Sequence, residues 1–185
     1  MKTFNNILLI ASLTLLLTAC GEESAVSNPD KEYKIKGGFG LTMGRESKNL
    51  TKGYLEDNKA FDFSPEKPNP IFTTYTYSVT PNTHLIYGIK LKSPLNLSRK
   101  DCKTQRKTLI EETLAHLGES PTFKISDEGN KWKIRENNQR EITIDCERAL
   151  TAGSLQLVMT YNDTALSKLS YTEWSKHQDD ITKPQ

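Results

Sequence analysis

Residues 71–91 read IFTTYTYSVTPNTHLIYGIKL, and the predicted fold is built outward from this stretch. β-branched and aromatic residues recur at a period of two from Ile71 to Val79, which is typical of a half-buried strand. Pro81 and Asn82 then predict a turn. The returning strand places Ile86 on one face and four apolar residues on the other: Leu85, Tyr87, Ile89 and Leu91. The stretch therefore predicts an antiparallel β-hairpin.

A helix is predicted directly after the hairpin, from Ser98 to Leu117. Ser98 is the expected N-cap, with Asp101 three residues further on, and Gly118 ends the helix. Its apolar side consists of Cys102, Leu109, Ile110, Leu114 and Leu117.

Strand patterns recur over 123–126, 131–135, 142–146 and 155–161. Asn162 and Asp163 then cap a second helix that reaches Trp174. The order of elements predicts the fold class α+β. We expect an antiparallel β-sheet, one main helix packed on one of its faces, and a second, C-terminal helix.

The segment before the hairpin has weaker patterns. Residues 37–40 read GGFG, but the lysine and hydroxyl that follow the last glycine of a P-loop are absent. We therefore interpret the glycines as a conformationally special entry to the domain. Residues 48–70 hold three prolines and scattered apolar residues, so we expect an irregular segment with a short helix near 51–58.

An apolar run from Ile7 to Leu17 follows Lys2 and ends in Leu17-Thr18-Ala19-Cys20. A basic start, a short apolar segment and small residues at the end are typical of a secretory leader. The last four residues resemble the lipobox of bacterial lipoproteins. The resemblance implies cleavage before Cys20 and acylation of Cys20, with palmitate among the expected acyl groups.

The resemblance also implies a location. Gly21 is not the aspartate that retains such proteins at the inner membrane, so we expect the outer membrane, with the domain facing the periplasm. The predicted organisation is a signal peptide over 1–19 and a flexible tether over 20–36. A single α+β domain over 37–175 and a polar tail over 176–185 complete it.

Charge and cysteine content limit the function classes. The chain has 25 basic and 23 acidic residues among 185, which argues against a nucleic-acid-binding domain. Cys102 and Cys146 remain after Cys20, an even pair in an oxidising compartment, and both lie on apolar sides of their elements. We therefore predict a Cys102–Cys146 disulfide, with two free buried thiols as the alternative.

The sequence contains no recognisable catalytic or metal-binding pattern. His84, His116 and His177 are far apart, and no nucleophile, base and orienting group can be named together. We therefore expect a non-catalytic protein without a cofactor or metal. An active site assembled from distant residues is the alternative.

One stretch concentrates positive charge between residues 90 and 107. Its predicted contacts with an anionic envelope component or an acidic protein are Lys90, Lys92, Arg99, Lys100, Lys103, Arg106 and Lys107. Lys131, Lys133 and Arg135 add a second basic run. An ordinary solvated face is the alternative for both.

The predicted function is that of a membrane-anchored envelope lipoprotein that acts by binding. The alternative is a periplasmic inhibitor or immunity-type lipoprotein that neutralises a hydrolase, and a hydrolase itself comes third. An inhibitor needs a protruding loop, for which 127–130 (DEGN) is the candidate. We favour an ordinary turn there, and a turn predicts that alanine at Asp127 and Glu128 leaves stability unchanged.

Overall fold

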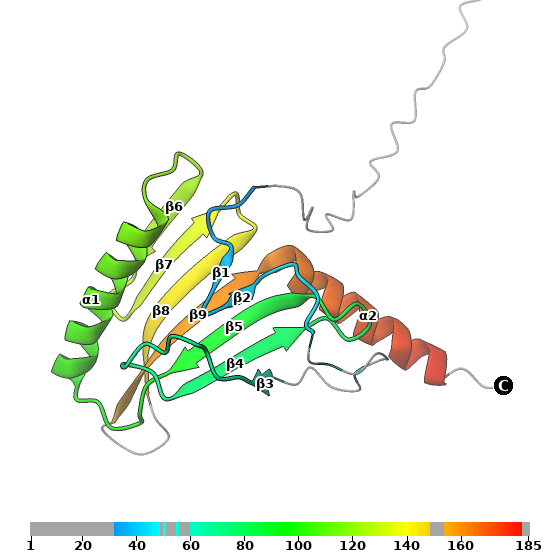
Figure 1. Ribbon diagram of the computed structural model, residues 1–185, viewed down its shortest axis with the longest axis horizontal. Coiled ribbons are helices and arrows are strands. Elements are labelled where there is room, and N and C mark those ends of the chain that lie inside the picture. Colours follow the sequence, from blue (N-terminus) through cyan, green and yellow to red (C-terminus); the bar gives the residue numbers. More distant parts are fainter. Residues whose placement is uncertain (1–31, 49, 51–54, 56–59, 149–153, 183–185) are drawn as a thin grey trace, which may run out of the picture.

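The computed structural model describes residues 32–48, 50, 55, 60–148 and 154–182 (Figure 1). The predicted signal peptide, Cys20 and most of the predicted tether lie outside these residues. So does nearly all of the short helix expected near 51–58.

In the described part of the chain, seven strands form one antiparallel sheet in the spatial order β3-β4-β5-β9-β8-β7-β6 (Figure 1). The strands are β3 (Ala60–Asp62), β4 (Thr74–Val79), β5 (Ile86–Lys92), β6 (Phe123–Asp127), β7 (Lys131–Glu136), β8 (Arg140–Arg148) and β9 (Leu155–Asp163). The helices are α1 (Arg99–Leu117) and α2 (Thr164–Thr182). The predicted α+β class, with a main helix and a C-terminal helix, is confirmed.

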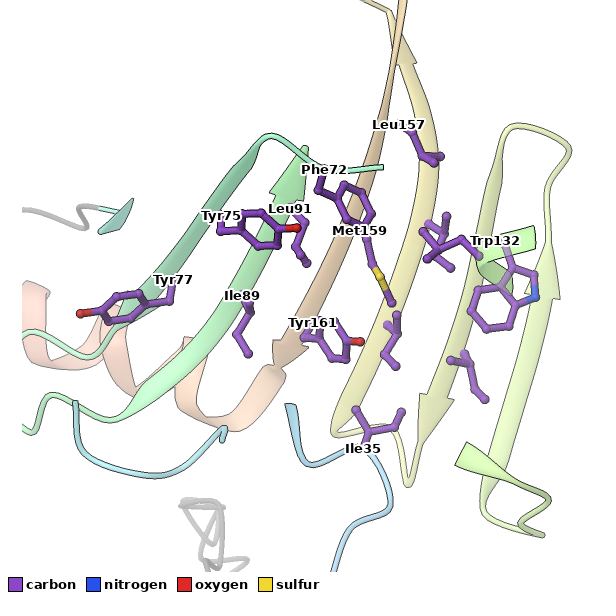
Figure 2. Packing of buried hydrophobic residues seen from close by; sticks show 14 of the residues in the cluster. Ile35, Phe72, Tyr75, Tyr77, Ile89, Leu91, Trp132, Leu157, Met159 and Tyr161 are labelled. Carbon is purple, nitrogen blue, oxygen red and sulfur yellow. The ribbon is translucent and has the colours of Figure 1, made fainter. Parts of the chain in front are cut away.

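One face of the sheet carries the hydrophobic core (Figure 2). Tyr77 on β4 lies opposite Ile89 on β5, and Ile89 lies opposite Tyr161 on β9. Tyr161 in turn lies opposite Ile142 on β8. Because strand side chains alternate between faces, these residues and their neighbours at a spacing of two share that face. We call it the core face.

The predicted hairpin is β4 with β5, but the side chains before Gly88 are placed differently from the prediction. The register shifts between Ser78 and Val79, and Val79 pairs with Ile86. This irregularity turns Ile86 into the core, where it is 3% exposed, and leaves Tyr87 half-buried. A bulge inserts one residue into the alternation, which a strict period of two does not anticipate.

α1 begins and ends as predicted. The Ser98 hydroxyl accepts a hydrogen bond from the backbone N–H of Asp101, and the N–H of Gly118 donates to the carbonyl of Leu114. The helix packs on the core face over β8 and β9. The predicted disulfide is confirmed, since Cys102 on α1 and Cys146 on β8 are bonded, with their Cα atoms 6.1 Å apart.

Residues before the expected domain boundary at residue 37 already pack into the core. Tyr33 is 2% exposed and Ile35 is fully buried. Both carboxylate oxygens of Glu136 accept backbone N–H groups, from Lys34 at 3.0 Å and from Ile35 at 2.9 Å. The last residues assigned to the tether are therefore part of the core.

A buried ion pair binds the segment around Ile35 to the sheet. Arg140 donates from Nε to Asp163 Oδ2 at 2.9 Å, and both side chains are almost fully buried. Its other nitrogens donate to the carbonyls of Ile35 and Met43, and the guanidinium lies over the Tyr33 ring. A buried charge is stable only when it is paired and hydrogen-bonded, and this arrangement meets both conditions.

The glycine-rich entry is a small ribbon of two strands, β1 (Gly37–Gly38) and β2 (Leu41–Thr42). Gly37 has φ +130°, and a Cβ there would lie 2.3 Å from the carbonyl oxygen of Leu41. The position therefore requires glycine, in agreement with the interpretation of this stretch as a special entry.

α2 follows β9 without a break. Asp163 caps it, because its Oδ1 accepts the N–H groups of Ala165 and Leu166. The helix contacts β5 and β9 and lies behind β4 and β5 in Figure 2, on the side away from the core side chains. It continues to Thr182, so most of the expected polar tail is helical.

Candidate functional site

A groove of about 320 Å³ lies between α1 and the β1–β2 ribbon, above the core face of the sheet. Leu109, Thr113 and Leu117 of α1 form one wall, and the backbone around Gly37 and Gly38 forms the other. Ile142 of β8 with Met159 and Tyr161 of β9 lie at its floor. The volume is at the lower end of the range for sites that enclose a small molecule.

The most unusual group in the groove is the Tyr161 hydroxyl. Tyr161 is 8% exposed, and burial raises its pKa to about 12. The hydroxyl forms no hydrogen bond with another described residue. The hydroxyl oxygen is not among the buried side-chain atoms that lack a partner in the described residues, so it opens to the solvent of the groove, where it can donate to a bound molecule.

Two neighbours hold the Tyr161 ring. Phe39 packs edge-on against it, with the ring centroids 6.5 Å apart. A Cβ added to Gly38 would lie 3.0 Å from the ring carbon and the hydroxyl oxygen of Tyr161. The absence of a side chain at position 38 therefore leaves room for the phenol at the floor.

The rim of the groove is polar and more basic than acidic. Lys34, Lys36 and His116 line it together with one carboxylate, Glu112. Lys34 Nζ donates to the carbonyl of Glu119 at 2.6 Å, which places this ammonium beside the C-terminal end of α1. Lys36 lies 3.7 Å from Glu32 in a pair exposed to solvent, and such a pair is weak.

The predicted basic contacts do not form one patch. Lys90 and Lys92 alternate with Ile89 and Leu91, so they lie on the face of the sheet opposite the core face. The α1 cations lie on the core side, on the exposed surface of a helix that packs on that face: Arg99, Lys100, Lys103 and Lys107. The sheet therefore separates the two groups.

Arg106 is not a surface cation. It is 8% exposed and pairs through Nη2 with Asp127 Oδ1 at 2.5 Å. The same oxygen accepts the backbone N–H of Gly129. The 127–130 turn is therefore joined to α1. This contact leads us to expect that Asp127→Ala lowers stability, in place of the unchanged stability that an ordinary turn predicts.

The second basic run is balanced by acids. Glu141 pairs with Lys133 at 3.7 Å and with Arg135 at 2.9 Å, and Glu147 lies 4.0 Å from Lys90. Asp145 lies among the same strands, and burial followed by the nearby charge of Glu147 raises its pKa. This face of the sheet is a mixture of charges, as an ordinary solvated face would be.

The described residues hold no group of three metal-ligating side chains, and no helix among them is long and apolar enough to cross a bilayer. Sequence reasoning missed the groove, because its walls come from segments 34–39, 109–117 and 142–161. Only the Gly37-Gly38 pair gave a local signal.

Comparisons with known proteins give no assignment. No protein-family model matches the chain, and neither a curated protein nor a solved structure matches it.

Proposed function

We propose that this protein is a lipid-anchored lipoprotein of the bacterial envelope that binds an anionic envelope component and catalyses no reaction. The lipobox resemblance of Leu17-Thr18-Ala19-Cys20 supports the anchor and the outer-membrane location. The groove supports the binding role. The observation that carries it is the Tyr161 hydroxyl, which opens to the groove at an apolar floor beneath a basic rim and is hydrogen-bonded to no other described residue.

The lining of the groove indicates the chemistry of its ligand. Leu109, Ile142 and Met159 present an apolar surface that favours an apolar body. They are at most 3% exposed, so most of the favourable burial, about 25 cal/mol per Å², would come from the surface of the ligand itself. The Tyr161 hydroxyl donates to an oxygen, and the Lys34 and Lys36 ammonium groups favour negative charge. The best match is a small molecule or chain end with an apolar body and one acidic group.

Octanoate is a suitable probe, and 1-octanol is its uncharged match. Isothermal titration of the purified domain should show saturable octanoate binding that exceeds octanol binding and weakens as salt rises. Tyr161→Phe keeps the ring and removes the donor, so octanoate affinity should fall about 3–10-fold, as expected for one lost hydrogen bond.

Tyr171→Phe is the matched control, because Tyr171 is 65% exposed on α2 and lies outside the groove. Its octanoate affinity should equal that of the parent. Equal affinities for octanoate and octanol, or no loss in Tyr161→Phe, would contradict the proposed ligand class.

A further inference from the structure

α2 carries an exposed apolar stripe. Five large hydrophobic residues are exposed in the described part of the chain, and three of them lie on this helix. Tyr171 is 65% exposed, Trp174 36% and Ile181 61%. The Tyr171 and Trp174 rings are neighbours, with centroids 6.2 Å apart. Single exposed apolar side chains are ordinary, but a group on one element marks an interaction surface.

The three residues project on the same side of the helix. Successive helical residues are about 100° apart, so Trp174 and Ile181 both lie within about 80° of Tyr171. On the same wheel Glu173 lies about 160° from Tyr171, on the opposite side. Its carboxylate accepts hydrogen bonds from the N–H of Asn82 and the hydroxyl of Thr83 in the β4–β5 turn. Tyr171 therefore faces away from the sheet. Trp174 and Ile181 lie about 100° and 80° from Glu173, so they project from the flank of the helix and are exposed there.

The start of α2 meets the segment that leads back to Cys20. The backbone N–H of Thr164 donates to the Gln139 carbonyl at 2.8 Å, and the Tyr33 hydroxyl donates to the Gln139 side chain. If the predicted tether is a flexible chain, the 13 steps from Cys20 to Tyr33 give a root-mean-square reach of about 20 Å. Tyr171 lies about 10 Å along the helix from Thr164. A bilayer that holds Cys20 is therefore within reach of the stripe.

We infer that α2 lies on the surface of the bilayer to which Cys20 is anchored, with Tyr171, Trp174 and Ile181 in the headgroup region. Tyrosine and tryptophan suit this region, because one end of each ring system is apolar and the other carries a polar group. Anchoring gives the helix a high effective concentration at the membrane, so a small stripe is sufficient. The contact would fix the orientation of the domain. This inference rests on the proposed lipid anchor.

The protein carries its own coupling site for the test. In the chain from residue 20 onward, made without lipid, Cys20 is the free thiol, since Cys102 and Cys146 are bonded to each other. Cys20 is coupled to maleimide-bearing lipid in phosphatidylethanolamine–phosphatidylglycerol vesicles. Trp132 is 3% exposed and contributes a constant background, so changes report on Trp174. Coupling should shift the tryptophan emission to shorter wavelength and make it quenchable by brominated acyl chains.

Two double variants distinguish a specific contact of the stripe with the bilayer from nonspecific adsorption of exposed apolar side chains. Tyr171→Ser with Ile181→Ser keeps the Trp174 reporter and should remove most of the shift and quenching. Leu95→Ser with Ile125→Ser is the matched control, since these residues are 56% and 55% exposed outside α2, and it should behave as the parent.

No change in Trp174 emission on complete coupling would overturn the inference. So would equal losses in both double variants, or a shift that grows with the surface density of coupled protein, which would indicate a second copy as the partner. Chemical coupling makes these results independent of acylation in cells. Failure of the anchor itself would appear separately, in the membrane retention of the native chain.

Discussion

Arg106 and Asp127 show how a charge identified in the sequence as a surface contact can serve the fold. Arg106 is buried between α1 and the sheet, and its Nε has no partner among the described residues. Asp127 is thus the ionic partner that compensates the burial of this guanidinium. Burying a guanidinium without a partner is costly, so the pair is a structural requirement of the α1 packing.

Asp127→Ala should therefore destabilise the domain by about 1–3 kcal/mol, the cost of leaving a buried donor unsatisfied. Urea unfolding followed by circular dichroism measures this difference. Glu128→Ala is the matched control in the same turn, where the side chain is exposed, and it should change stability by no more than about 0.5 kcal/mol. Equal stabilities for the two variants would show that the Arg106–Asp127 pair contributes nothing.

At the scale of elements, α1 has two roles: it covers the core face over β8 and β9, and it lines one side of the groove. The Cys102–Cys146 bond joins its first turn to β8, and the Gly118 cap ends it beside Lys34. The helix position over β8 and β9 sets the distance from Leu109 and Thr113 to the β1–β2 ribbon. Loosening α1 should therefore affect ligand binding as well as stability.

Cys102→Ala with Cys146→Ala should lower the free energy of unfolding by about 2–4 kcal/mol, because the bond closes a long loop with a sequence separation of 44. The melting temperature of the variant, compared with the parent under oxidising and reducing conditions, measures this effect. Reduction should lower the melting temperature of the parent and leave the variant unchanged. A parent that melts at one temperature in both conditions would contradict the prediction.

The sequence predicted the elements well, for physical reasons. The period of two in β4 and the Ser98 and Gly118 caps of α1 are local signals that can be recognised in the sequence. They agree with the observed fold, in which one sheet is covered by a helix. The bulge beside Val79 was not predictable, because its cause is the pairing of Val79 with Ile86 across a turn. The short strand β3 was missed because three residues carry too little alternation.

At the scale of the whole molecule, the groove depends on contacts that no local pattern encodes. Ile35 and the β1–β2 ribbon lie over β8 and β9 because Arg140 and Glu136 bind backbone groups more than ninety residues away. Asp163 contributes by pairing with Arg140. Charged residues on strands read as solvated surface in a sequence, since most of them are. Here they are buried, because the N-terminal segment packs against them.

The lipid anchor is the property on which the proposed role of the whole molecule depends. Acylated Cys20 would carry several acyl chains, and a single chain gives only marginal membrane binding, whereas two or more hold a protein stably. Cys20→Ala removes the acceptor sulfur, so the chain should stay as an uncut precursor or leave the membrane fraction. Metabolic labelling with palmitate and fractionation of the envelope measure both effects.

Ala19→Ser is the control for this test, because it keeps Cys20 and a small residue before the cleavage site. This variant should be labelled and retained as the parent is. Membrane retention of an unlabelled Cys20→Ala chain that has lost its leader would contradict the anchor, while the prediction that the groove binds octanoate would be unaffected.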